Sequence, residues 1–332
     1  MKTVQTFYIT LFCLLISVFV KSQVSHNADS CTFKPYGKPI VTIYSNFSAH
    51  NSNNATNYGF EILRAYLGYS HNFSPNFSGR IVLDVSNVEN QKPSAMTAFL
   101  KIAEIDYTTN SLKLDFGMIG TKMFKLQETI WGKRYLYKSL QDEYNFASSA
   151  DLGVSVDIKI LPKLVLDFSI LNGEGYKNIQ TDSTVLTGLG LTIEPFDHFY
   201  LRVYADRMKK ESAQISYVAF AGFRGKNISL GAEYNQQNGH GMVVNKNFTG
   251  ISLYSTVVLS SKFNVFGRFD AVKSSKLGTS TTGWNTTDGQ FYMAGIEYFP
   301  TKGIQIAPNI RYANKSVGYA ETSFYLNVGL NL

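Results

Sequence analysis

Charged side chains recur at alternate positions within apolar stretches of this sequence, a pattern that suits ion selection by a water-filled passage. Seven basic and eight acidic residues stand at such positions, so the polar faces are close to neutral. They are Arg64, Arg80, Lys113, Lys159, Arg202, Arg268 and Arg311 against Asp84, Asp115, Asp151, Asp157, Asp167, Asp206, Glu233 and Asp270. We expect selectivity to depend mainly on Arg64, Arg80, Arg202, Arg268, Arg311, Asp84, Asp115, Asp206 and Asp270.

Catalytic and metal-binding chemistry finds little support in the sequence. A serine hydrolase, the main alternative from another class, needs a serine beside a histidine that a carboxylate or amide orients. The five histidines fall in predicted termini, loops or turns, and none stands in mid-strand beside a serine: His26, His50, His71, His198 and His240. One of the two cysteines lies in the N-terminal leader, which leaves a single thiol at Cys31. We therefore expect no enzymatic activity, no metal site and no cofactor.

Stretches that alternate apolar and polar residues follow one another down the chain with the period of two that is typical of β-strands. Leu201 and Val203, for example, share one face of such a stretch, while Arg202 lies on the other. The sequence predicts about sixteen strands, near residues 39–47, 59–72, 77–86, 96–107, 112–119, 148–160, 164–171, 184–194, 199–206, 214–223, 228–236, 248–259, 263–271, 290–298, 304–313 and 321–332.

The connections between these strands alternate between short turns and longer polar loops. This is the arrangement that consecutive antiparallel strands need when both chain ends lie on the side of the short turns. The longest loop, residues 120–147, is the third of the long ones. Its basic residues exceed its acidic residues by two, with Lys122, Lys125, Lys133, Arg134 and Lys138 against Glu128, Asp142 and Glu143. These cations would either give a narrow pore a mild anion preference or solvate a surface loop near lipid phosphates.

Strands of a soluble β-sandwich also alternate apolar and polar residues, but further features favour a closed transmembrane barrel. Aromatic residues gather beside the short turns, as at Tyr69, Phe73 and Phe77, where an interfacial girdle needs them. Full charges in mid-strand suit a wet lumen better than a sandwich core. Aromatic residues make up 14% of the chain and charged residues only 17%, which excludes disorder. A barrel of this size holds water or a plug, and we expect no plug, because only about 16 residues separate the expected cleavage site from the first strand.

The first residues have the form of a secretory leader. Lys2 supplies a basic start, an apolar run covers residues 8–20, and Val20 and Ser22 fit a cleavage site before Gln23. The run is too short to span a bilayer as a helix, and no later stretch approaches the necessary length. We expect residues 1–22 to be a signal peptide, residues 23–38 a short periplasmic segment, and residues 39–332 an all-β transmembrane barrel.

Several short motifs resemble the outer-membrane porins of Bacteroidota-type bacteria, grouped with the phosphate-selective porin O and P superfamily. They are Arg64-Ala65-Tyr66-Leu67-Gly68-Tyr69 with the turn that follows, Gly117-Met118-Ile119-Gly120-Thr121, Ser148-Ser149-Ala150-Asp151-Leu152-Gly153-Val154 and Asn172-Gly173-Glu174-Gly175-Tyr176. The resemblance covers most of the mature chain. The terminal Leu332 departs from it, because outer-membrane barrels usually end in an aromatic residue.

The resemblance implies a sixteen-stranded, trimeric outer-membrane channel whose third loop folds into the lumen. We expect passive diffusion of small hydrophilic solutes or ions, with a mild preference for phosphate-like anions. The expected partners are outer-membrane lipid, such solutes and two further copies of the chain, but no nucleic acid. An adhesin or complex-bound barrel with large binding loops is the alternative, and conduction by the isolated protein separates the two.

Overall fold

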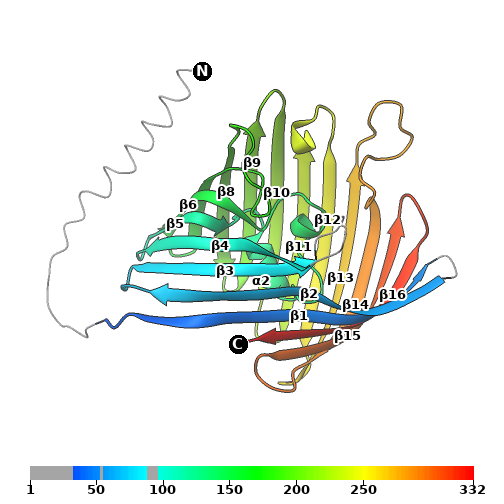
Figure 1. Cartoon of the computed structure of the whole chain (residues 1–332), viewed down its shortest axis with the longest axis horizontal. Helices are drawn as coiled ribbons and strands as arrows, with labels where there is room; N and C mark the ends of the chain where they lie inside the picture. Colours follow the sequence, from blue (N-terminus) through cyan, green and yellow to red (C-terminus); the bar gives the residue numbers. More distant parts are fainter. Residues whose placement is uncertain (1–32, 53–54, 88–95) are drawn as a thin grey trace. The chain divides into compact units, whose positions relative to one another are not determined.

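The computed structural model describes residues 33–52, 55–87 and 96–332, and it forms one closed barrel of sixteen antiparallel strands (Figure 1). The strands are β1 (Tyr36–Ser52), β2 (Ala55–Asn72), β3 (Phe77–Asn87), β4 (Met96–Thr108), β5 (Leu112–Gly120), β6 (Ala150–Leu161), β7 (Leu164–Leu171), β8 (Leu186–Phe196), β9 (Phe199–Lys209), β10 (Ala213–Arg224), β11 (Ile228–Asn238), β12 (Phe248–Val258), β13 (Phe263–Ser274), β14 (Gly289–Tyr298), β15 (Ile304–Lys315) and β16 (Glu321–Asn331). The helices are α2 (Lys125–Trp131), α3 (Leu140–Glu143) and η1 (His240–Met242).

Neighbours in the sequence are neighbours in the sheet, and β1 closes the barrel by pairing with both β2 and β16. Tyr44, for instance, lies between Arg64 on one side and Gly329 on the other. The predicted fold and the number of strands are confirmed. The predicted signal peptide lies outside the described residues, as does most of the predicted segment 23–38. Within the described ranges, no helix is both long enough and apolar enough to cross a membrane.

Two predicted boundaries were wrong because backbone pairing continues past the point where apolar alternation ends. The predicted loop at residues 48–58 is largely sheet, since β1 extends to Ser52 and pairs with β2 from Ala55 onward. The first strand also begins at Tyr36 instead of residue 39, paired with Asn72. Polar side chains at a strand end do not prevent backbone hydrogen bonds, so alternation underestimates strand length there.

The connections between strands differ in length at the two ends of the barrel. The short connections, such as residues 197–198 and 225–227, lie at one end, which we call the turn end. The opposite end, the loop end, carries the longer connections 121–149 and 172–185, which we call loop 3 and loop 4. Along β9 the burial of side chains alternates, with Leu201 and Val203 exposed and Arg202 and Tyr204 buried. The outer face is therefore apolar and the inner face largely polar.

Candidate functional site

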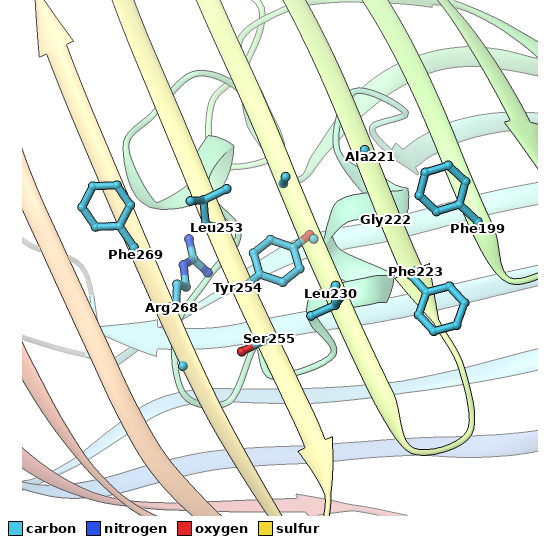
Figure 2. Close-up of a pocket in the computed structure, with 13 residues that line it drawn as sticks. Phe199, Ala221, Gly222, Phe223, Leu230, Leu253, Tyr254, Ser255, Arg268 and Phe269 are labelled. Carbon is cyan, nitrogen blue, oxygen red and sulfur yellow. The ribbon is translucent and has the colours of Figure 1, made fainter.

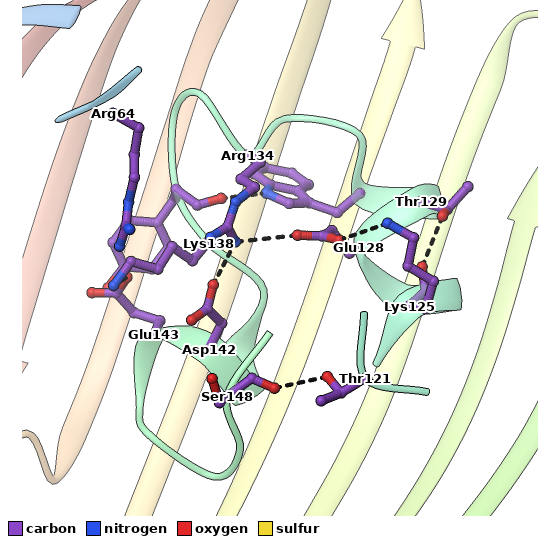
Figure 3. A network of polar contacts seen from close by, with 12 residues as sticks. Arg64, Thr121, Lys125, Glu128, Thr129, Arg134, Lys138, Asp142, Glu143 and Ser148 are labelled. Atoms are coloured by element: carbon purple, nitrogen blue, oxygen red, sulfur yellow. Dashed lines mark hydrogen bonds and ion pairs between the residues drawn. The ribbon is translucent and has the colours of Figure 1, made fainter. Parts of the chain in front are cut away.

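Loop 3 enters the barrel from a closed base between β5 and β6. The Thr121 hydroxyl donates to the Ser148 carbonyl at 2.7 Å, and the Thr121 backbone N–H donates to the Ser149 carbonyl at 3.2 Å (Figure 3). Beyond this base, α2 ends at Trp131, and Gly132, which follows it, has a positive φ of 65° that suits glycine and reverses the chain. The loop therefore leaves and rejoins the wall at one point and can fold inward as a unit.

Apolar side chains of loop 3 form the main cores inside the barrel. One cluster joins loop residues to inward-facing side chains of β10 and β12–β15: Ile130, Trp131, Tyr135 and Leu136 with Phe220, Tyr254, Phe266, Phe291, Met293 and Ala307. A second cluster joins Met123, Phe124, Leu140, Tyr144 and Phe146 to Tyr204, Val218, Phe248 and Val272. Burial of this apolar surface holds the loop against the wall from β9 to β15.

Four arginines of the wall donate to backbone carbonyls of loop 3. Arg202 reaches the Lys122 carbonyl at 2.9 Å, and Arg224 reaches the Thr129 carbonyl at 2.9 Å. Arg268 donates to the Lys138 carbonyl at 2.7 Å and Arg311 to the Leu136 carbonyl at 2.9 Å. Three of the five arginines expected to set selectivity, Arg202, Arg268 and Arg311, are thus buried contacts that fix the loop.

Two of the five basic residues predicted for the constriction also fasten the loop to the wall. Lys122 lies 3.0 Å from an Asp115 oxygen and 2.8 Å from an Asp157 oxygen. Lys133 lies 2.5 Å from a Glu297 oxygen, and both of these side chains are buried. Their charges are neutralised in place. Of the other three, Lys125 and Lys138 have more exposed side chains, whereas Arg134 is as buried as Lys122 and pairs with Glu128 and Asp142.

A group of cations and tyrosines lies where loop 3 faces β2 and β4, and we call it the tyrosine–cation cluster: Arg64, Tyr66, Lys101, Arg134, Tyr176 and Lys177. The Tyr66 hydroxyl accepts from Lys101 at 3.2 Å and from Arg134 of the loop at 3.2 Å. Arg64 donates to the Tyr176 hydroxyl at 3.1 Å, and Lys177 lies 5.9 Å from the centre of the Tyr176 ring. The cluster thus joins loop 3, loop 4 and two strands around one part of the lumen.

The cluster holds more positive than negative charge. Arg64 pairs with the buried Asp84 at 2.5 Å, and Arg134 pairs with Asp142 and, at 3.1 Å, with Glu128. In the part of the chain that the structure describes, no ion pair joins Lys101 or Lys177 to a carboxylate. Lys101 instead lies over the rings of Tyr66 and Tyr176, at 4.7 and 5.2 Å from their centres. These two lysines therefore carry the uncompensated charge of the cluster.

Sequence reasoning missed Lys101 and Lys177, and the geometry explains why. The register between β3 and β4 shifts at Val82, so Lys101 has no partner in the ladder and occupies a bulge. A similar shift in the β1–β2 ladder lies beside Arg64. A bulge redirects a side chain that strict alternation assigns to a regular face. A lysine in mid-strand was the available signal for Lys101, whereas Lys177 lies in loop 4, outside every predicted strand.

The remaining predicted wall residues are mostly held in local pairs. Arg80 contacts Glu104 at 2.6 Å and keeps a half-exposed side chain. Asp115 contacts Lys113 at 2.6 Å in addition to Lys122, and Asp270 accepts from Arg268. Asp206 is buried on the inner face of β9. Most of these charges are therefore neutralised in local pairs, whereas Asp206 has no ion-pair partner among the described residues.

The prediction that His50 lies in a loop was wrong. This residue belongs to β1, where its ring lies 2.7 Å from Glu321, 3.1 Å from the Ser48 hydroxyl and 3.0 Å from the Ser323 hydroxyl. Pairing between β1 and β16 brings His50 close to Glu321 and Ser323. These residues are far apart in the sequence, so the contact could not be predicted from it. Ser48 is only 9% exposed, and backbone pairing with β2 and β16 occupies the strand around it, which leaves no backbone oxyanion hole.

The ion pair between Arg134 and Asp142 makes the loop network resistant to acid. Burial opposes ionisation of Asp142, but the Arg134 guanidinium outweighs it and lowers the pKa of Asp142 to about 2. A carboxylate with a lowered pKa stabilises the fold above its unfolded pKa, and this stabilisation is lost as pH falls through the folded value. We expect Asp142→Asn to cost roughly 2 kcal/mol of unfolding free energy at neutral pH, by the conversion of pKa to free energy.

The difference between wild type and Asp142→Asn should stay constant from pH 7 to about pH 5 and then shrink toward pH 2. Unfolding in lipid vesicles at several pH values measures it. A difference that disappears already near pH 6 would show that Asp142 is not held as an ionised partner of Arg134.

Comparisons with known proteins agree on the fold. No model of a protein family matches the sequence, and no curated protein matches it. Among solved structures, OmpF of Salmonella typhi, in complex with daunomycin, has a TM-score of 0.70 at 10% identity, covering 89% of this chain and 97% of its own.

Two further structures are similar over comparable lengths. OprB of Pseudomonas putida has a TM-score of 0.68 at 9% identity, covering 89% of this chain and 94% of its own. An anion-selective porin from Comamonas acidovorans has a TM-score of 0.66 at 9% identity, covering 90% of this chain and all of its own. The chain therefore has the closed β-barrel fold of outer-membrane porins.

Proposed function

We propose that this protein is an outer-membrane porin that lets small hydrophilic solutes and ions diffuse passively, with a mild preference for anions. The observation that carries the proposal is the tyrosine–cation cluster, which places two uncompensated lysines, Lys101 and Lys177, beside the loop that narrows a closed barrel. Charge in a narrow, low-dielectric passage acts on every solute that crosses it.

The apolar outer face supports the membrane location. Phe116, Val203 and Ile310 are each more than half exposed on this face, where lipid would cover them. Aromatic side chains such as Phe196 and Phe199 lie beside the short connections of the turn end. We assign the turn end to the periplasm and the loop end to the outside of the cell, with residues 1–22 as the cleaved leader.

Anion preference follows from the geometry and not from total charge. Most charges on the inner wall are paired within a few ångströms, so their potentials largely cancel within a Debye length of about 8 Å. The four cations of the tyrosine–cation cluster face three carboxylates, Asp84, Glu128 and Asp142, which leaves a net positive charge beside loop 3. The alternative is that the lysines of loop 3 only contact solvent. This alternative does not explain why Lys101, on the barrel wall, lies beside the loop.

Single-channel recording tests the proposal directly. We expect the purified protein to conduct in planar bilayers and the double variant Lys101→Gln/Lys177→Gln to shift the reversal potential toward cation preference. The matched control is Lys262→Gln/Lys302→Gln, which removes two exposed charges at the turn end, away from the cluster. A wild-type protein that does not conduct would contradict the porin proposal and favour the adhesin. Equal shifts of the reversal potential in both double variants would show that the tyrosine–cation cluster is not the selectivity site.

We also propose a homotrimer of the type that the sequence resemblance to Bacteroidota-type porins implies. OmpT of Vibrio cholerae, in a structure described as its trimer form, has a TM-score of 0.59 at 11% identity, covering 89% of this chain and 99% of its own. Native mass spectrometry of the detergent-solubilised protein gives the copy number directly.

A further inference from the structure

A cavity of about 240 Å³ lies inside the barrel at the loop end, between loop 3 and the inner faces of β14–β16. Pockets for drug-sized ligands measure about 300–1,000 Å³, so this cavity suits a smaller molecule. The charged side chains that line it are two bases and two acids: Arg311, Lys315, Glu143 and Glu321. The cavity therefore offers both signs of charge within a small space.

Arg311 is a buried cation without a carboxylate partner. The side chain belongs to a residue that is only 9% exposed, and its Nε and Nη2 donate to amide and carbonyl oxygens at 2.9–3.1 Å. Within the described ranges, no hydrogen bond uses its Nη1 and no ion pair neutralises its charge. Arg268, the wall arginine that Figure 2 shows on β13, is instead neutralised by Asp270. Arg311 therefore keeps a donor group and a positive charge for a ligand.

Lys315 adds a second cation to the same side of the cavity. It lies four residues beyond Arg311 on β15, and its side chain is exposed. In the part of the chain that the structure describes, no ion pair joins Lys315 to a carboxylate. Two cations without counter-ions, one of them an arginine, suit a carboxylate group of a ligand.

Glu143 and Glu321 each keep one carboxylate oxygen free. Oε1 of Glu321 accepts from Ser323 at 3.0 Å and lies 2.7 Å from the His50 ring, and Oε2 of Glu143 lies 3.7 Å from Lys138. Among the described residues, none donates a hydrogen bond to the other oxygen of either glutamate. These two oxygens are acceptors that an ammonium group of a ligand can use.

The lining argues against two other kinds of ligand. A phosphate-like anion would meet the two glutamates. A sugar ring packs on a free aromatic face, but Tyr137 stacks on Phe291 with ring centres 4.4 Å apart, and Tyr144 is buried in the second apolar cluster. The third ring, of Tyr325, has the Arg311 guanidinium 3.6 Å from its centre.

We propose that this cavity binds a free amino acid as a zwitterion, with its carboxylate at Arg311 and Lys315 and its ammonium group at Glu143 and Glu321. The proposal rests on the porin function above, because it names a class of solute that the channel takes up from the outside. Charges of both signs on opposite groups of the cavity match a molecule that carries both.

Saturation-transfer NMR on the full-length protein in detergent, titrated with L-alanine, tests the proposal. N-acetyl-L-alanine lacks the ammonium group and L-alaninamide lacks the carboxylate. Each should bind about ten-fold or more weakly than L-alanine, since a hydrogen bond to a charged group is worth at least about that factor. Equal binding of the three compounds would overturn the proposal.

Two variants assign the ligand groups to side chains. Lys315→Gln should weaken binding of L-alanine and N-acetyl-L-alanine about ten-fold and leave L-alaninamide unchanged. Glu143→Gln should instead weaken L-alanine and L-alaninamide. The controls are Lys273→Gln, exposed on the outer face of β13 near the loop end, and Glu211→Gln, exposed between β9 and β10. Affinities that are the same in variants and controls would contradict the assignment of the site.

Bilayer recordings on the same preparations separate this site from the porin function. A protein that conducts but binds the three compounds equally refutes the amino-acid site alone. A protein that distinguishes them through Lys315 and Glu143 yet does not conduct contradicts the porin function alone.

Discussion

Deletion of residues 123–147 is expected to raise single-channel conductance several-fold. The segment contributes the loop side chains of both internal apolar clusters and contacts the wall from β9 to β16, so its removal opens most of the lumen. Thr121, Ser148 and Ser149 remain, and their hydrogen bonds close the base of the loop. Conductance in planar bilayers at fixed salt measures the effect.

The control removes the tip of another loop. Residues 277–282 lie beyond the isolated bridge between Lys276 and Gly283, and their deletion should leave conductance unchanged. If the barrel without residues 123–147 conducts no better than the intact protein, loop 3 does not obstruct the passage, and the selectivity assigned to Arg134 and its neighbours fails with it.

Arg268→Met is expected to be the most destabilising single substitution in the wall. Arg268 and Asp270 are both completely buried, and the guanidinium donates to both carboxylate oxygens at 2.9 Å as well as to the Lys138 carbonyl. The guanidinium also lies 5.1 Å from the centres of the Trp131 and Tyr137 rings. Loss of one partner of a buried ion pair costs about 3–5 kcal/mol, because the other charge stays buried without compensation.

Chemical unfolding in lipid vesicles measures this cost. The double variant Arg268→Met/Asp270→Leu should recover much of it, since both buried charges are then gone. Lys163→Met, which breaks an exposed pair with Asp197 at the turn end, should leave the unfolding free energy unchanged. A small effect of Arg268→Met, equal to that of Lys163→Met, would mean that water reaches Asp270 and that loop 3 does not seal this part of the wall.

The strands could be predicted from the sequence because each presents one face to an apolar and one to a polar environment. That alternation is a local property, and it located the cores of all sixteen strands and the third long loop. The ends of the strands were harder to predict. In β1 and β2, for example, pairing continues through polar residues up to Ser52 and begins again at Ala55.

The site was harder to predict because it depends on contacts between distant residues. Nothing local distinguishes Lys133, which pairs with Glu297 across 164 positions of sequence, from Lys138, which stays near the loop surface. Lys101 reaches the lumen through a bulge that the alternation does not reveal. The number of charges could thus be predicted from the sequence, but the sequence did not reveal which of them are neutralised in ion pairs.

The wall arginines hold loop 3 by its main chain, and this affects how the barrel can change over evolution. A carbonyl oxygen is present whatever the residue, so the anchors from Arg224 and Arg268 do not depend on the side chains of Thr129 and Lys138. Substitutions at these positions can therefore accumulate over evolution without loosening the path of the loop. The barrel can therefore keep the backbone of loop 3 in place while its side chains change one at a time, by natural drift or by design.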